Sequence, residues 1–411
     1  MKEIQFLHMA DLHLDSPFIG LSTLPQPLFS AIQESTFQSL ERITTVAIKE
    51  AVDFVLIAGD IYDSEDQSVR AQARFSKEMK RLEVANIPVF MIHGNHDFIE
   101  KHKEKLTLPS NVHVFSEQVE VMSHKTATGV SVNIYGFSYN ERHIRSSRVD
   151  KYKIQGNADF HIALLHGSEV SSSEEHDLYA PFRVQEISKK GFDYWALGHI
   201  HKRQLLAESP SIYYPGNIQG RNRKESGEKG ASIITLSEAS TTIDFIGTSP
   251  IIWEEAVITL PENSEINAFY RETTKLLESY QGRSHSYFLH IIVKMENKQK
   301  IDTNDWLQML QEEVEITDNT FVWIHKLTTE ITNQSNSQTW YESHLAGEEI
   351  KHSFETLQDE SAFYQAVEAL YLESGVSRYL DDLSEIDRER LLHDALMELG
   401  RTLAEVEGDD K

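Results

Sequence analysis

Five short motifs rich in aspartate and histidine are spread over the first half of the sequence. They are Asp11–His13, Gly59–Asp60, Gly94–Asp97, His166–Gly167 and Gly198–His201. Together they offer carboxylates, one asparagine amide and imidazoles, which are nitrogen and oxygen ligands without sulfur. Such a set suits Mn, Fe, Zn or Ni, whereas Ca²⁺ prefers ligands that are all oxygen. The motifs therefore predict a site for divalent metals of the first kind.

The number of candidate ligands exceeds what a single octahedral ion can use. Two ions that share a carboxylate can use all of them. A pair of metals about 4 Å apart holds the attacking and leaving oxygens of an in-line phosphoryl displacement and lowers the pKa of a water between them. We therefore expect two divalent metal ions and the hydrolysis of phosphoesters. Each fragment alone occurs by chance, but five in order argue against coincidence.

Each motif stands where an apolar run rich in Val, Ile and Phe stops. These runs are Ile4–Ala10, Asp53–Ala58, Ile87–His93, Phe160–Leu165 and Tyr194–Leu197. The first three are separated by segments with the apolar spacing of helices, and this alternation predicts a mixed or parallel sheet covered by helices. Ligands bind at the carboxyl ends of strands in such sheets, so we expect the five motifs to converge.

Further apolar runs predict the rest of the architecture. Runs at Val130–Phe137, Ser211–Tyr214 and Ala231–Leu236 follow more closely and suggest a second sheet packed on the first. Residues 251–331 alternate strand and helix patterns, as a small α/β cap would. The polar stretch 332–339 is the best linker candidate. Beyond it, residues 340–411 have a helical pattern, with one apolar stripe at Leu392, Ala395, Leu396, Leu399 and Leu403.

Length and composition limit the class of protein. The 411 residues suggest two to three domains at about 150 residues each, and 40% hydrophobic residues are enough for a full core. The absence of cysteine excludes a disulfide framework and fits a reducing compartment. No stretch approaches the ~20 apolar residues that span a bilayer, and no secretory leader pattern opens the sequence. We expect a cytoplasmic protein without a membrane partner.

The charge is acidic overall but unevenly distributed. The formal net charge of -26 argues against a general attraction to nucleic acid. Residues 331–411 hold 19 acidic and six basic residues, which is half of that net charge. Two basic groups interrupt the acidic background. The first is the segment 142–153, with Arg142, Arg145, Arg148, Lys151 and Lys153, and the second comprises Lys202, Arg203, Arg221, Arg223 and Lys224. Both follow predicted strand ends, so they either contact DNA phosphates beside the metals or are solvated loops.

The motif set resembles the calcineurin-like metallophosphoesterase superfamily. The segments ADLHLDSPF (residues 10–18), AGDIYD (58–63), IHGNHD (92–97), ALGHIHK (196–202) and YYPGN (213–217) further resemble the SbcD-like DNA repair exonucleases, YhaO-like proteins among them. The likeness is specific over residues 1–250, looser over 250–330 and weak beyond. It implies an α/β fold: a two-sheet αββα sandwich (1–250) with a small α/β cap (251–331) and a helical C-terminal tail (340–411).

The resemblance also implies roles for single residues. One metal would be held by Asp11, His13, Asp60 and His201, and the second by Asp60, Asn95, His166 and His199, with Asp60 bridging. His96 matches the family histidine that contacts the scissile phosphate and protonates or stabilises the leaving oxygen, work that suits an imidazole pKa near neutrality. Asp97 would orient His96 through a hydrogen bond. Family members generally prefer manganese.

Three further positions lie near the motifs but are not assigned as ligands. Asp15 stands where many relatives have glycine, and Asn217 replaces a serine that is common after Tyr-Pro-Gly. Neither is a ligand position, so they bear on substrate preference rather than on the metals. Asp63 is either a carboxylate that supports the metal site or a solvated turn residue.

The resemblance implies a manganese-dependent DNA exonuclease or endonuclease that works in DNA repair. Its relatives dimerise through helices of the catalytic domain, and the region after the cap binds a coiled-coil SMC-like ATPase, SbcC-like in type. The apolar stripe of the tail docks either on such a partner or on the protein itself. Three alternatives stay open: a phosphodiesterase for small nucleotide substrates, a non-catalytic subunit that binds DNA ends, and an enzyme active only within its complex.

Overall fold

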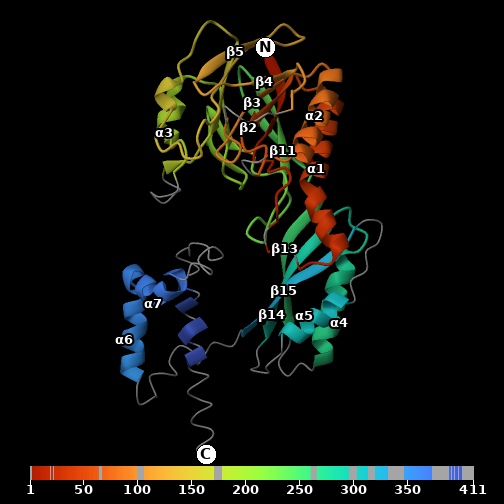
Figure 1. The fold of residues 1–411 in the computed structure, drawn as a ribbon, viewed down its shortest axis with the longest axis vertical. Helices are drawn as coiled ribbons and strands as arrows, with labels where there is room; N and C mark the ends of the chain where they lie inside the picture. The colour runs from red at the N-terminus through yellow and green to blue at the C-terminus, as the bar shows by residue number, and fades with distance from the viewer. Residues whose placement is uncertain are drawn as a thin grey trace, which may run out of the picture. The chain divides into compact units, whose positions relative to one another are not determined.

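The computed structural model describes residues 2–18, 20–21, 23–63, 67–99, 106–170, 178–260, 266–295, 303–312, 320–331, 347–372 and most of 388–399. The chain forms two compact units, each described by itself (Figure 1). The first comprises Met1–Ile258, Tyr270–Ile292 and Ile301–Thr328, and the second comprises the remainder. The predicted linker 332–339 lies outside the described residues, and the predicted domain boundaries remain predictions.

The first sheet has six strands in the order β12-β11-β1-β2-β3-β4. Its members are β1 (Glu3–Met9), β2 (Phe54–Ala58), β3 (Val89–Ile92), β4 (Val112–Val114), β11 (Gly230–Ser237) and β12 (Thr241–Gly247). Strands β1 to β4 are parallel, and β11 joins β1 in the antiparallel sense. The carboxyl ends of β1, β2 and β3 therefore lie side by side at one edge.

The second sheet also has six strands, in the order β5-β6-β7-β8-β10-β9. They are β5 (Glu120–Lys125), β6 (Ser131–Gly136), β7 (Phe160–His166), β8 (Tyr194–Gly198), β9 (Gln204–Glu208) and β10 (Ser211–Tyr214). The four central strands are parallel, and the two at the edges are antiparallel to their neighbours. This sheet again has one edge where the carboxyl ends of β7 and β8 meet.

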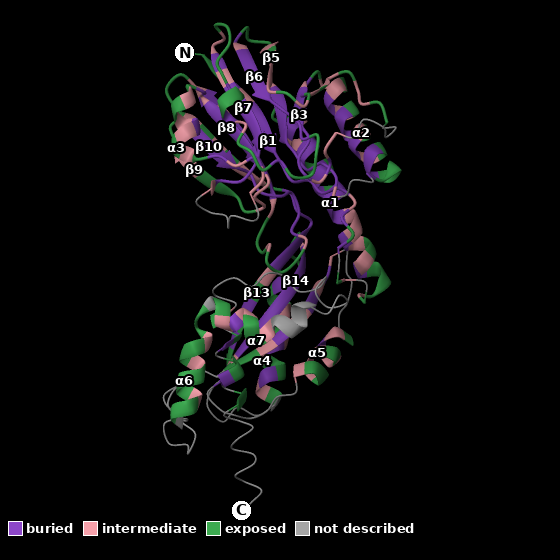
Figure 2. Cartoon of the chain, turned by 60° about the vertical axis from the view of Figure 1, so that its left-hand side comes forward, coloured by how far each residue is buried: buried purple, intermediate pink, exposed green. Residues whose placement is uncertain are grey.

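Helices pack on the outer faces of both sheets, two long ones on the first and a short one, together with loops, on the second. Helices α1 (Gln26–Lys49) and α2 (Val69–Val84) pack together on the first sheet, and the short α3 (Val184–Ile187) lies by the second (Figure 1). The strands are buried on two faces, so they read as continuous apolar runs (Figure 2). One core lies under α1 and α2, and a second fills the space between the sheets around Phe6, Phe54 and Leu164.

The predicted cap is a three-stranded sheet in the order β13-β14-β15 with two helices. Its elements are β13 (Ile251–Leu260), α4 (Ile266–Tyr280), β14 (Ser286–Met295), α5 (Thr303–Glu312) and β15 (Val322–Ile331). Trp253 and Phe288 stack on each other and pack in one apolar cluster with Leu28 and Ile32 of α1. Side chains of the long first helix thus anchor this sheet.

The second unit contains α6 (Gly347–Leu357) and α7 (Glu360–Leu372). Leu392 and Leu396, members of the predicted apolar stripe, are buried and line a groove with Ile350 and Phe354 of α6. Leu403 lies outside the described residues. The part of the stripe that the structure describes therefore packs at least partly on the chain itself. No helix among the described residues is long and apolar enough to cross a membrane.

The fold class is confirmed, and the strands that sequence patterns miss share one property. Strands β4, β5, β9 and β12 lie at sheet edges, where most of their residues are half-buried or exposed. An edge strand need not carry a continuous apolar run, so its pattern is weak. The predicted central strands agree with the observed ones to within two residues at each end.

A buried histidine between the sheets makes folding stability depend on pH. His8 of β1 is fully buried, and its Nδ1 lies 3.0 Å from the Tyr194 hydroxyl oxygen. Burial lowers its pKa to about 3 from the ordinary value of 6.5. Since the folded pKa is the lower one, neutral His8 stabilises the fold fully above pH 6.5, and that stabilisation is lost as the pH falls toward 3.

We expect acidification from pH 7 to pH 5 to cost metal-free protein about 2 kcal/mol of unfolding free energy through His8, at about 1.4 kcal/mol per pKa unit. His8→Gln should lack this part of the pH dependence. Tyr194→Phe, which removes the same hydrogen bond but leaves the imidazole, should retain it. Urea unfolding in EDTA measures all three proteins, and equal pH slopes for His8→Gln and the wild type would refute the assignment.

Candidate metal centre

The five sequence motifs lie at the carboxyl ends of the parallel strands of both sheets. Asp11 and His13 follow β1, Asp60 follows β2, and Asn95 follows β3. His166 is the last residue of β7, and His199 and His201 come directly after β8. The structure brings all seven predicted ligands together because the two sheets face each other with these ends at the same edge.

The backbone is bent to aim these side chains. Asp11, His13, Asp60 and His199 have φ values of 51°, 42°, 50° and 99°, in the left-handed region that side chains other than glycine rarely adopt. Such conformations persist only where surrounding contacts impose them, and they cluster at functional sites. Here the amide of Asp11 donates to Gly59 O at 3.1 Å, and that of His13 donates to Asp60 O at 3.1 Å.

Two glycines allow the ligands to approach one another. A Cβ on Gly59 would overlap with His166 Nδ1, and a Cβ on Gly94 would overlap with Asp60 Oδ1. Both approaches are far closer than van der Waals contact. The glycines of the predicted Gly-Asp and Gly-Asn-His-Asp motifs are therefore required by space at this edge.

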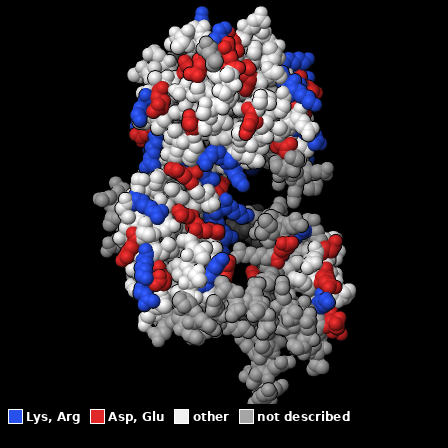
Figure 3. Space-filling view, turned by 180° about the vertical axis from the view of Figure 1, so that it is seen from behind, with Lys and Arg blue, Asp and Glu red and all other residues white. Residues whose placement is uncertain are grey.

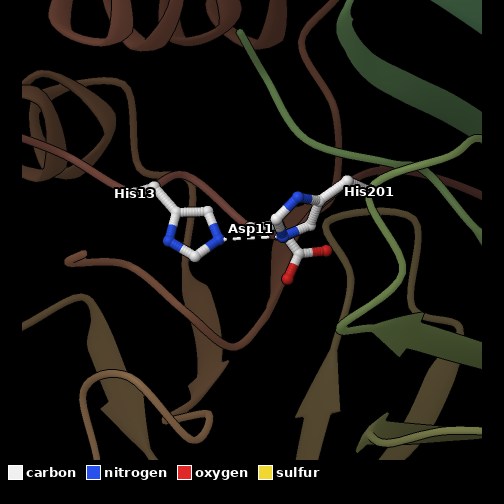
Figure 4. Close-up of side chains that lie close together, drawn as sticks. All are labelled: Asp11, His13 and His201. Carbon is white, nitrogen blue, oxygen red and sulfur yellow. Dashed lines mark hydrogen bonds between the residues drawn. The ribbon is translucent and has the colours of Figure 1, made fainter. Parts of the chain in front are cut away.

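The first ligand group consists of Asp11, His13 and His201 (Figure 4). The Nδ1–H of His201 donates to Glu225 Oε1 at 2.7 Å. A carboxylate only accepts, so Nδ1 carries the proton and Nε2 has a free lone pair. His13 Nε2 lies 3.0 Å from His201 Nε2. That is the separation of two neighbouring ligands at right angles on an ion with bonds of about 2.1 Å, so the donors fit one cation.

The second group gathers around His166. Its Nδ1–H donates a hydrogen bond to Ala58 O at 2.9 Å, which leaves Nε2 as the atom that can bind a metal. That Nε2 lies 3.0 Å from Asn95 Oδ1 and 3.4 Å from Asp60 Oδ2. His199 Nδ1 lies 3.2 Å from the same Asn95 oxygen. An amide oxygen, a carboxylate and two imidazoles thus converge on a second position that fits a cation.

Asp60 lies between the two groups, as a bridging ligand must. Its Oδ2 is 3.4 Å from His166 Nε2 and 3.8 Å from His13 Nε2. Burial alone would raise the pKa of this carboxyl, but the imidazoles of His166, His13 and His96 hold it well below its ordinary value. Asp60 is therefore a carboxylate, only 1% exposed, in a site built to compensate its charge.

The imidazoles respond to burial in two ways. Burial lowers the pKa of His13 to about 4 and that of His199 to about 3, with neighbouring cationic groups adding to the effect. Burial would also lower the pKa of His166, but the carboxylates of Asp60 and Asp11 raise it to about 9. In the absence of metal a proton on His166 compensates the buried carboxylates. A divalent cation among the same atoms would displace that proton.

His96 stands beside the ligand groups with one nitrogen available. Its Nδ1–H donates to the Asp63 carbonyl oxygen at 3.0 Å, so Nε2 is free. Its backbone amide donates to Asp60 Oδ1 at 3.0 Å. Its ring lies edge-on to that of His13, with centroids 5.1 Å apart. This half-buried imidazole is thus fixed next to the metal positions and can exchange a proton there.

Asp97 differs from the expectation that it orients His96. Its carboxylate is fully buried and accepts hydrogen bonds from Gly94 N and Ile61 N, each at 2.8 Å. His93 Nδ1 lies 3.3 Å from one of its oxygens. Asp97 therefore ties the loop after β3 to the loop after β2. The physical reason is that the turn of the Gly-Asn-His-Asp motif directs its carboxylate to backbone amides, while the Asp63 carbonyl takes over the orientation of His96.

Three further charged residues support the first ligand group. Asp63 Oδ1 lies 3.0 Å from His13 Nδ1 and is paired with Arg221. Of the two alternatives for Asp63, these contacts favour the carboxylate that supports the metal site over the solvated turn residue. Arg221 Nη2 lies 3.8 Å from Glu225. Glu225 was not indicated by the sequence, since it lies 24 residues beyond His201 in a loop without an apolar pattern. A ligating imidazole usually has a hydrogen-bond partner on its other nitrogen, but this general rule does not say which residue supplies it.

The two positions that depart from the family pattern have structural roles. Asp15 has a φ of 63°, where glycine is unstrained, and its Oδ2 accepts from the Ser68 hydroxyl at 2.5 Å. That serine also caps α2. Asn217 Nδ2 donates to Glu225 Oε2 at 2.7 Å. Both residues therefore fix loops that carry or support metal ligands.

The predicted basic groups differ in how far they reach solvent. Arg142, Arg145, Lys202 and Arg223 are exposed, whereas Arg148 is half-buried. Arg221 points instead to Asp63 and Glu225 beside the metal positions. On the face in Figure 3, basic side chains gather in small groups separated by acidic ones. Contact of these residues with DNA remains a prediction.

Comparison with known proteins agrees with this geometry. Residues 4–203 match the calcineurin-like phosphoesterase family. The chain is 36% identical to the uncharacterized metallophosphoesterase YhaO of Bacillus subtilis (strain 168), over 82% of this chain and 84% of that protein. It is 25% identical to the DNA double-strand break repair protein Mre11 of Saccharolobus solfataricus, over 72% and 77% of the two chains. The Mre11 protein of Sulfurisphaera tokodaii is 28% identical over 76% and 78%.

The family uses a dinuclear divalent metal site, and the two groups of converging donors around Asp60 suit a metal-dependent phosphodiesterase. By its sequence and by the fold that positions these donors, the chain belongs to the calcineurin-like metallophosphoesterase family.

Proposed function

We propose that this protein is a manganese-dependent DNA nuclease that hydrolyses phosphodiester bonds in DNA repair. The observation that carries the proposal is the position of Asp60 between two groups of ligand atoms, with the free Nε2 of His96 beside them. Relatives from two organisms are named DNA double-strand break repair protein Mre11, which favours DNA as the substrate. Both exonuclease and endonuclease activity fit this site.

The residues of the chain would divide the work of hydrolysis. Two divalent metals, when bound, polarise the phosphoester and lower the pKa of a water molecule. Asp11, Asp60 and Asn95 supply oxygen donors, and the imidazoles supply nitrogen donors. His96 would give a proton to the leaving oxygen from Nε2 as the imidazolium, which carries a proton on both nitrogens; loss of the Nε2 proton leaves the neutral ring with its Nδ1–H held by the Asp63 carbonyl. Manganese suits this mixture of oxygen and nitrogen donors, as Fe, Zn and Ni also can.

Exposed cationic side chains near the carboxyl ends of the strands support a polymeric substrate. Arg142 and Arg145 follow β6, and Lys202 and Arg223 follow β8 and β10. A small nucleotide phosphodiester needs fewer phosphate contacts than a duplex, so it is the second candidate substrate. The small substrate is favoured by the ligand set, because the ligands are buried within the chain and do not need a long substrate to complete the site.

We extend the proposal to partners of the same kind as those of the SbcD-like nucleases. The chain would work in the cytoplasm as a homodimer bound to a coiled-coil SMC-like ATPase of SbcC type. The helices α6 and α7, which follow the cap, support this view because they lie outside the metal centre and add a separate unit to it.

Replacement of Asp60 tests the bridging position. We expect Asp60→Asn to lose both metals and all hydrolysis, because one neutral amide oxygen cannot serve two cations. Elemental analysis would measure the metal content. Activity would be measured with manganese on linear duplex DNA and on a small chromogenic phosphodiester.

Asp193→Asn is the matched control, since its carboxylate accepts from His161 N outside the metal centre; it should keep both metals and both activities. Two metals retained in Asp60→Asn would exclude a bridging role. Cleavage of the small ester by the wild type without degradation of DNA would favour the second candidate substrate.

Replacement of His96 separates proton transfer from metal binding. We expect His96→Gln to keep both metals and to lose about 10²- to 10⁴-fold in turnover, the usual contribution of a general acid. His161→Gln, a change to an imidazole that contacts the Tyr135 hydroxyl away from the centre, should leave the rate unchanged. Wild-type turnover in His96→Gln would remove His96 from catalysis.

Charge reversal tests whether the first basic group contacts DNA phosphates. Arg142→Glu with Arg145→Glu should weaken binding of linear duplex and lower the slope of log affinity against log salt by about 0.9 for each phosphate that the variant no longer neutralises. Binding is measured in EDTA so that the DNA stays intact. The control variant reverses the charges of Lys49 and Lys189, which precede β2 and β8 at the opposite strand ends. If the salt slope changes no more in the test variant than in this control, Arg142 and Arg145 do not contact DNA phosphates and lie in solvated loops.

A further inference from the structure

We propose that Glu225 is a positioning residue that holds one tautomer of His201 and thereby sets the affinity of one of the two metal positions. The inference rests on the metal centre and not on DNA as the substrate. Glu225 lies in the loop between β10 and β11, and its side chain is 12% exposed. Its role follows from the hydrogen bonds that meet at its two oxygens.

The two carboxylate oxygens of Glu225 have separate partners. Oε1 accepts from His201 Nδ1–H at 2.7 Å. Oε2 accepts from Asn217 Nδ2 at 2.7 Å and from the Arg221 backbone amide at 2.8 Å. Three hydrogen bonds therefore occupy this carboxylate, so Glu225 acts as a support for His201 rather than as a ligand itself. The Arg221 guanidinium also lies nearby, 3.8 Å from Oε1 and 3.4 Å from His201 Nδ1, but the shorter 2.7 Å contact with the carboxylate decides the tautomer.

The loop that carries Glu225 is closely held. A Cβ on Gly220 would lie 2.6 Å from the Glu225 carbonyl oxygen, so only glycine permits this turn. The Glu225 amide donates to Asn222 O at 3.0 Å. Trp253 of β13 donates from its indole nitrogen to Gly220 O at 3.0 Å. The backbone that carries the Glu225 side chain is thus fixed, so the carboxylate has a defined position.

This contact decides which nitrogen of His201 carries the proton, and so whether the nitrogen that faces the metal position can bind a metal. With Nδ1 protonated against Glu225, the Nε2 lone pair points to His13 Nε2 at 3.0 Å and to the Asp11 carboxylate. The opposite tautomer would place a proton in that space and remove a metal donor. A partner on the other ring nitrogen is a general way to fix a ligating imidazole, and its loss typically costs about 10- to 100-fold in metal affinity.

The amide variant Glu225→Gln should reverse this preference. Two hydrogen bonds, from Asn217 and the Arg221 backbone amide, converge on the Oε2 position, whereas Oε1 accepts one, from His201, and has the Arg221 guanidinium 3.8 Å away, beyond hydrogen-bond distance. The single oxygen of glutamine is therefore best placed at the Oε2 position, which turns its NH₂ group toward His201 Nδ1. His201 must then accept at Nδ1 and carry its proton on Nε2. The side chain keeps its size while the tautomer changes.

The test measures the tautomer and the metals separately. In metal-free protein at pH 8.5, nitrogen-15 spectra of the imidazoles, with His201→Gln for assignment, should show Nδ1–H in the wild type and Nε2–H in Glu225→Gln. Titration with manganese should show two tight sites in the wild type and one in the variant, with the second weakened about 10- to 100-fold. Hydrolysis of a small chromogenic diester should recover at high manganese, with kcat near that of the wild type.

Glu78→Gln is the matched control, because Glu78 is a similarly buried carboxylate that pairs with Arg81 on α2. It should leave the tautomer, both metal affinities and the activity unchanged. An unchanged tautomer or two unchanged manganese affinities in Glu225→Gln would overturn the proposal. So would equal weakening of both sites without recovery at high manganese, since that indicates a general loss of structure. Failure of the wild type to cut DNA would count against the proposed substrate and not against Glu225.

Discussion

The buried carboxylate of Asp60 is the constraint on which the rest of the site depends. A charge that is 1% exposed is stable only if neighbouring groups compensate it. Here that compensation comes from the amide of His96 and from the imidazoles around it, and cations bound by the converging donors would add to it. Two sheets must meet at one edge to assemble these groups, and four ligands accept left-handed backbone conformations to reach it.

Three of the imidazoles around Asp60 follow a common rule, whereas His199 directs Nδ1 to the Asn95 oxygen. In His166, His96 and His201 the Nδ1–H is held by a fixed oxygen, from Ala58, Asp63 and Glu225 respectively. Each ring therefore presents Nε2, either to a metal position or to a reacting group. Two of the three oxygens are backbone carbonyls, which no substitution can remove. Of these three rings only His201 depends on a side chain. His13 also has a side-chain partner, with its Nδ1 3.0 Å from Asp63 Oδ1, so Glu225 and Asp63 are the points at which sequence change could tune the centre.

The sequence indicates the ligands because their positions follow from topology. Parallel strands such as β1 and β2 carry apolar runs, and polar residues directly after such runs must meet at one edge. The supporting contacts do not follow from topology. The orientation of Asp97 toward Gly94 N, and of Arg221 toward Asp63 rather than solvent, depends on the shape of individual turns. Edge strands such as β12 were also missed, because exposure on one face removes the apolar run.

The support of His201 also links the metal centre to the cap. The loop before Glu225 bonds to the first strand of the cap at two places, from Gln219 Nε2 to Ile251 O at 2.8 Å and from Trp253 Nε1 to Gly220 O at 3.0 Å. Trp253 in turn packs with Phe288 against the first helix. A displacement of this strand would therefore act on the loop that carries the Glu225 carboxylate. The cap strand thus belongs to the mechanical support of the metal centre, because His201 keeps its metal-binding tautomer only while that loop is held in place.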